Sequence, residues 1–120
     1  MKTIAILLLL MVAAHADDSH EMAFEFYGNG GPGDTILAAT MDGHLAFEPG
    51  VPHEESAKKA MEMMCALGPF AAAPYDLSIG SAINIGEDGL VVFGPGFKGN
   101  DEDRAGWLIV GRAYAERCTI

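Results

Sequence analysis

The chain contains two cysteines, Cys65 and Cys118, and a bond between them would restrict the fold more than any other feature of the sequence. In the chain-entropy description of disulfides, closing a loop of roughly 50 residues stabilises a domain by about 4 kcal/mol. That contribution is a large share of the total stability of a small domain. Disulfides persist in oxidising compartments, so the bond depends on whether the chain is exported.

The N-terminus has the three parts of a cleavable signal peptide. Lys2 supplies a positive charge, residues 4–14 lack any polar side chain, and Ala14 and Ala16 place small residues where a signal peptidase reads them. The apolar run is shorter than the roughly 20 residues that a membrane-spanning helix needs. We therefore expect residues 1–16 to be removed as a signal peptide, with a cut after Ala14 as the alternative. The product would be periplasmic or secreted, without a membrane anchor.

The remaining residues, 17–120, have the size of one domain. We expect a single exported globular domain, closed by a disulfide between Cys65 and Cys118. The expected bond would hold the C-terminal segment, which contains Trp107, against the segment around Cys65. Since Trp107 is the largest aromatic residue of the chain, this pairing would bring it into the core.

The charge of the chain excludes some classes of partner. It has 17 acidic and 7 basic residues, with a formal net charge of −10. Binding to nucleic acid requires clustered Lys and Arg, whereas the basic residues here are scattered apart from Lys58-Lys59. We expect no nucleic-acid partner. A basic partner or a cation is favoured instead.

Alternation and turn signals predict strands in the first part of the domain. Residues 22–27 alternate in hydrophobicity, as a half-buried strand does. The Asp42-Gly43 pair separates two apolar runs, 35–41 and 44–47, and such a pair is a strong hairpin signal. Residues 22–48 are therefore predicted to form a three-stranded meander.

A helix is predicted over residues 53–67, because its apolar side chains recur at helical spacing. Residues 77–85 alternate again and are predicted to form one strand, which the Asp88-Gly89 turn connects to another at 90–93. The predicted stripe on the helix consists of Ala57, Ala60, Met61, Met64 and Cys65.

The last segment is ambiguous between helix and strand. Asn100 followed by three acidic residues is typical of a helix N-terminus, so we predict a helix over residues 104–117, with a sixth strand as the alternative. The predicted order is β-β-β-α-β-β-α. This is a small α+β domain with a mainly antiparallel sheet of about five strands.

Met and His residues suggest a metal site. Thioether and imidazole ligands suit copper or zinc in exported proteins. However, Met at helical spacing usually fills a core, and neither Cys-x-x-Cys nor His-x-x-x-His spacing occurs. The candidate ligands are His20, His44, His53, Met61 and Met64.

No arrangement typical of catalysis is evident. Cys65 and His53 would be about 18 Å apart along one helix, too far to form a nucleophile–base pair. The glycine-rich loop at 28–33 precedes a predicted strand, whereas a phosphate-binding loop precedes a helix. The sequence favours a non-catalytic binding or accessory protein that contacts another protein and needs no cofactor. An exported copper- or zinc-binding protein with Met, His and Asp ligands is the alternative.

The first prediction concerns processing. If residues 1–16 are a signal peptide, the exported protein begins at Asp17. Intact-mass measurement of the exported fraction should give the mass of residues 17–120. Exported protein that retains Met1 would contradict the prediction.

Overall fold

The computed structural model describes residues 21–29, 31, 33–67 and 76–118. The expected signal peptide and His20 lie outside these residues. Within them the chain forms an α+β structure in the order β-β-β-α-β-β-β-α, which confirms the predicted fold class.

The elements form two antiparallel sheets and two helices. The first sheet has the order β2-β3-β4 and the second has the order β5-β6-β7. The first sheet consists of β2 (Met22–Tyr27), β3 (Thr35–Thr40) and β4 (Leu45–Phe47). The second sheet consists of β5 (Leu77–Ile79), β6 (Ile83–Ile85) and β7 (Val91–Phe93). The helices are α2 (His53–Ala66) and α3 (Asp101–Cys118).

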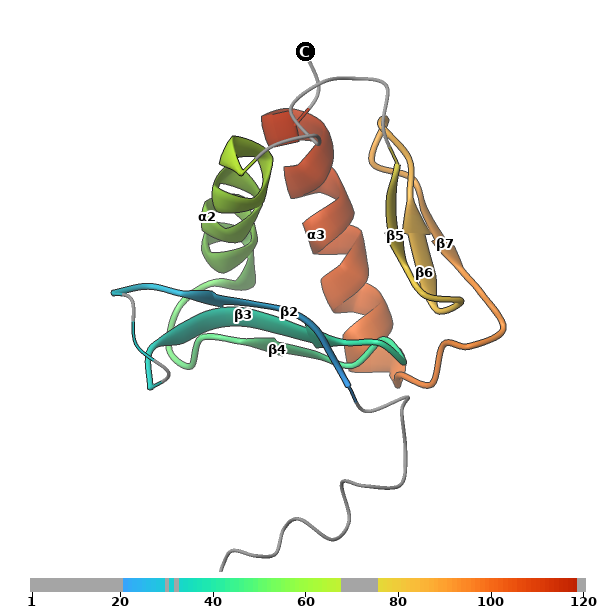
Figure 1. Ribbon diagram of the computed structural model, residues 1–120, viewed down its shortest axis with the longest axis horizontal. Helices are drawn as coiled ribbons and strands as arrows, with labels where there is room; N and C mark the ends of the chain where they lie inside the picture. The colour runs from blue at the N-terminus through green and yellow to red at the C-terminus, as the bar shows by residue number, and fades with distance from the viewer. Residues whose placement is uncertain (1–20, 30, 32, 68–75, 119–120) are drawn as a thin grey trace, which may run out of the picture.

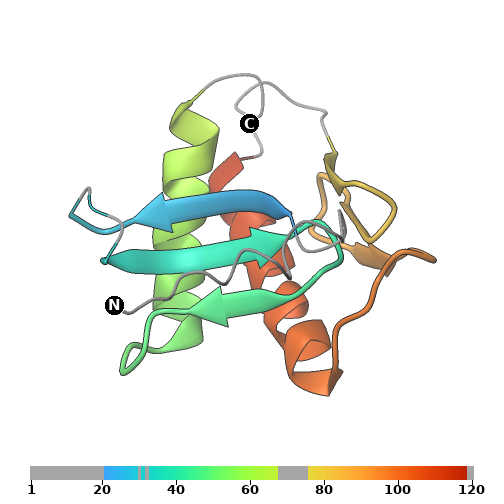
Figure 2. The same ribbon diagram turned by 60° about the horizontal axis from the view of Figure 1, so that its bottom comes forward.

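Helix α3 separates the two sheets. Figure 1 shows α2 and α3 side by side on one face of the first sheet, with the second sheet on the far side of α3. Figure 2 shows the three strands of the first sheet crossing in front of the helices. Because the sheets do not join, β2 and β5 are both end strands.

The first sheet is the predicted meander. Its central strand places Leu37 opposite Phe26 on β2 and Phe47 on β4. Gly43, in the Asp-Gly turn between β3 and β4, has a φ of 96°, a conformation that glycine adopts without strain. The hairpin signal therefore identified this turn correctly.

The strand predicted over residues 77–85 is wrong in one respect. The chain turns at Gly80, whose φ is 53°, and the amide of Ala82 donates to the carbonyl of Ile79. Strands β5 and β6 then pair with each other, with Ile79 opposite Ile83. Alternation continued through the turn in the sequence, so it gave no sign of the reversal, and the expected five-stranded sheet is instead two sheets of three.

The C-terminal segment is a helix, as predicted, and not a sixth strand. The side chain of Asn100 accepts a hydrogen bond from the amide of Asp103, 2.9 Å away, which caps the first turn. Acidic residues in that turn interact favourably with the positive end of the helix dipole. Trp107 and Tyr114 on this helix are almost completely buried.

The two helices meet at the cysteines. The predicted apolar stripe of α2 is buried, including Met61 and Cys65. The sulfur atoms of Cys65 and Cys118 lie at disulfide distance, and their Cα atoms are 5.3 Å apart. That separation falls within the range that disulfide geometry requires. Trp107 is fully buried, as expected from this pairing.

We predict that the disulfide stabilises the domain. Cys118→Ser should cost about 2–5 kcal/mol of unfolding free energy, because the unfolded chain regains the freedom that the closed loop removes. Thermal melts of the oxidised protein, the reduced protein and the variant measure this. Reduction of the wild type is the control for side-chain effects and should lower Tm similarly. A melt that is insensitive to reduction would count against the bond.

Candidate functional site

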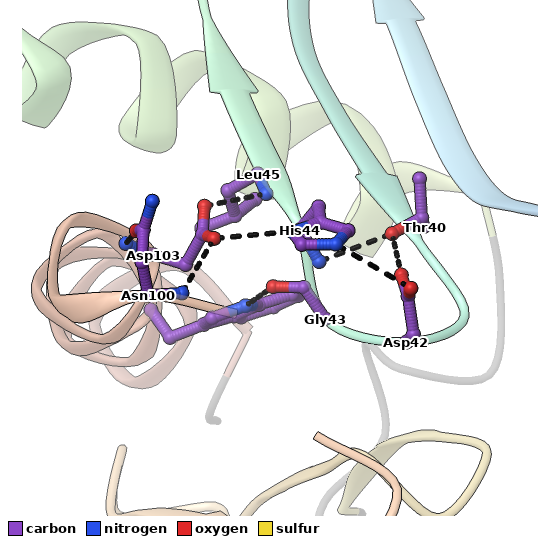
Figure 3. Close-up of polar contacts among 8 residues, drawn as sticks. Thr40, Asp42, Gly43, His44, Leu45, Asn100 and Asp103 are labelled. Atoms are coloured by element: carbon purple, nitrogen blue, oxygen red, sulfur yellow. Dashed lines mark hydrogen bonds and ion pairs between the residues drawn. The ribbon is translucent and has the colours of Figure 1, made fainter. Parts of the chain in front are cut away.

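An ion-pair cluster connects the hairpin of β3 and β4 to the start of α3 (Figure 3). Nδ1 of His44 lies 3.2 Å from Asp103 Oδ2, and its Nε2 lies 3.4 Å from Asp42 Oδ2. His44 is partly exposed, whereas both carboxylates are buried. When it is protonated, His44 pairs with both of them.

Asp103 is the centre of this cluster. Its Oδ1 accepts the amide of Leu45 at 3.1 Å, and its Oδ2 accepts the amide of Asn100 at 3.0 Å. The hydrogen bonds that Asn100 and Asp103 exchange form a reciprocal pair that resembles a capping box. The further bond from Leu45 lets Asp103 hold β4 as well. Burial raises the pKa of Asp103, but the hydrogen bonds from Asn100 and Leu45 and the nearby His44 outweigh burial. The net pKa lies below the ordinary value of 3.8, so the carboxylate is ionised at neutral pH.

Further contacts fix the turn of the hairpin. The indole Nε1 of Trp107 donates to the carbonyl of Gly43 at 2.7 Å, and the Thr40 hydroxyl donates to the Asp42 carboxylate. A Cβ at Gly43 would collide with the ring of Phe97. The turn is therefore held from the helix side and from the loop that follows β7.

The geometry of the cluster supports a structural role better than a chemical one. Both ring nitrogens of His44 face carboxylates, so neither faces an open site where a substrate proton could be accepted. The two carboxylates lie on opposite sides of the ring and do not converge on one point (Figure 3). Among the described residues, no three His, Cys, Asp or Glu side chains are grouped to hold a metal ion.

The other predicted metal ligands are dispersed. His53, at the start of α2, stacks on the ring of Phe47 with centroids 4.2 Å apart. Met61 and Met64 face the core, where they are buried. The structure therefore does not bring His44, His53 and these methionines together, and His20 lies outside the described residues.

An apolar cleft of about 640 Å³ lies between the two end strands. The described residues that line it are Ala23–Phe26 of β2, Leu77–Ile79 of β5, and Met41, Met64 and Leu67. The Leu67 side chain at its rim is 78% exposed. A cleft of this volume, lined mostly by apolar side chains, has the properties of a binding site.

Sequence reasoning did not identify the cleft. Its walls come from β2, β5 and the end of α2, and only the tertiary structure brings these together. The one signal in the sequence for an exposed apolar site was Leu67, which follows the last residue of the apolar stripe predicted for the helix. Asp103 was recognised as part of a helix N-terminus, but its contact with Leu45 on β4 has no sequence signature.

Comparison of the chain with protein-family models, curated proteins and solved structures gave no significant match. Within the described residues, neither helix is long and apolar enough to cross a membrane.

We predict that Asp103 makes the stability of the domain pH-dependent. Because its folded pKa lies below 3.8, ionised Asp103 stabilises the fold above that pH, and the stabilisation is lost as pH falls through the folded pKa. Asp103→Asn should cost about 1–3 kcal/mol at pH 7, since charge-assisted hydrogen bonds are lost. The difference from wild type should shrink between about pH 5 and pH 2.

Thermal melts across this pH range measure the effect. Asp101→Asn is the matched control, because it removes the same charge from an exposed position in the same turn. It should cost much less stability at pH 7 than Asp103→Asn, because it loses only an exposed interaction with the helix dipole. A constant stability difference between Asp103→Asn and wild type from pH 7 to pH 2 would show that the charge of Asp103 is not responsible.

Proposed function

We propose that this chain is a small exported acidic protein, periplasmic or secreted, that acts without catalysis by binding another protein. The observation that carries the proposal is the apolar cleft between β2 and β5. Exposed apolar surface beside a cleft is costly in water unless a partner covers it. Leu67, which lines the cleft, adds to this surface, since its side chain is 78% exposed.

Two further features support a protein partner. The signal-peptide pattern at residues 1–16 favours export, and a net charge of −10 disfavours nucleic acid and anionic membranes. The polar groups best suited to acid–base chemistry, His44 and its two carboxylates, contact one another. The copper or zinc alternative has no comparable support, because the candidate ligands in the described residues are apart.

Site-specific crosslinking tests the proposal. A photoreactive phenylalanine analogue is placed at Leu67 on the cleft rim or at Leu90, which is also exposed but does not line the cleft. Irradiation of the exported fraction should yield a discrete protein adduct from position 67 and none from position 90. The captured protein is identified by mass and titrated against the purified chain by calorimetry.

The same experiment can contradict the proposal. Absence of an adduct at position 67, or the same adducts at both positions, would argue against a protein partner at the cleft. So would a captured protein that shows no heat of binding to the purified chain.

A further inference from the structure

The cleft runs along the edges of strands and not across their faces. Successive side chains of a strand point to opposite faces of the sheet. Yet four consecutive residues of β2, Ala23–Phe26, line the cleft, and so do three consecutive residues of β5, Leu77–Ile79. A cavity that reaches every residue in turn lies beside the backbone, so it borders the edge of each strand.

Both edges lack a partner strand within the described chain. β2 pairs only with β3, and β5 pairs only with β6. Figure 2 shows β2 as the outermost strand of its sheet. Unpaired edges present rows of backbone donors and acceptors, and proteins usually protect them with charged side chains, Pro or bulges. The middle of β2, from Phe24 to Phe26, has no Pro, its register shifts lie towards the two ends of the strand, and Glu25 is its single charged side chain.

We propose that the cleft binds an extended peptide segment of a partner protein, which adds to the free edge of β2 or β5 as a further strand. This inference rests on the proposed function and specifies its partner. In strand addition, backbone hydrogen bonds provide affinity and alternate side chains enter pockets. The Ala23–Phe26 edge is roughly 13 Å long at strand spacing, enough for about four peptide residues.

Charge complementarity defines the partner further. The single charged residue among the described lining is Glu25, and exposed acids directly precede each strand, Glu21 before β2 and Asp76 before β5. A second copy of the chain would bring these acids together with a net charge of −10 on each molecule. The occupant is therefore a segment with alternating apolar residues and Lys or Arg near them, contributed by a different protein.

Selection from a peptide library tests the inference. The exported protein is immobilised and random nine-residue peptides are selected on it. Enriched sequences should have apolar residues at i, i+2 and i+4 and carry Lys or Arg. A selected peptide is then synthesised with and without N-methyl groups on two alternate backbone nitrogens, and the affinities are compared by calorimetry.

N-methylation should weaken binding by about tenfold or more, because it removes backbone donors and leaves the side chains unchanged. Leu67→Ser should also weaken binding severalfold, whereas Leu90→Ser, the matched loss of an exposed leucine, should not. Both positions are exposed, so neither variant should impair folding, and unchanged melts confirm this.

Three results would overturn strand addition. These are the absence of enrichment, enriched apolar residues at the helical spacing i, i+3 and i+4, or equal affinity of the N-methylated peptide. In each case, a specific adduct at position 67 would leave the proposed function standing. Failure of the crosslinking experiment would instead remove the proposed function itself, so the two failures are distinguishable.

Discussion

The hydrogen bond from Trp107 to Gly43 joins the two parts of the fold on which the rest depends. The indole of Trp107, a residue of α3, is fully buried, and the carbonyl to which it donates belongs to the turn between β3 and β4. A buried N–H without an acceptor is costly, so this contact fixes the rotation of α3 against the first sheet. Asp103, one helical turn earlier, holds β4 from the same side through Leu45. The turn and the helix therefore determine each other's positions.

Once α3 is fixed in this way, it determines where the other elements can lie. Its C-terminal end meets α2 at Cys65 and Cys118. The second sheet packs against the opposite face of α3. There, Gly111 of the helix is so close to the carbonyl of Gly89 that neither position has room for a side chain. Because α3 lies between the sheets, they cannot merge, and β2 and β5 keep one edge each without a partner strand from the described residues.

Local interactions are the part of this fold that the sequence predicts well. The Asp-Gly turns, the cap at Asn100 and the apolar stripe of α2 each depend on residues a few positions apart, and all three are confirmed. The turn at Gly80 was missed because apolar alternation continued through it. The division into two sheets was also missed, since it depends on where α3 packs. The cleft is a consequence of that division, so no local pattern could predict it.

The contrast between the two candidate sites supports binding more than catalysis. At the ion-pair cluster, the carboxylates of Asp42 and Asp103 both contact His44, and these contacts hold the hairpin of β3 and β4 in place. At the cleft, the Leu67 side chain is mostly exposed. The adjoining edges of β2 and β5 are not paired with any other strand of the described residues. Groups that a fold uses for its own stability are poorly placed to act on other molecules, because any rearrangement costs stability. Four of the residues that line the cleft, Phe26, Met64, Leu77 and Ile79, belong to the core and share this constraint. The exposed Leu67 side chain and the unpaired strand edges do not, and they are the groups that the proposed partner would contact.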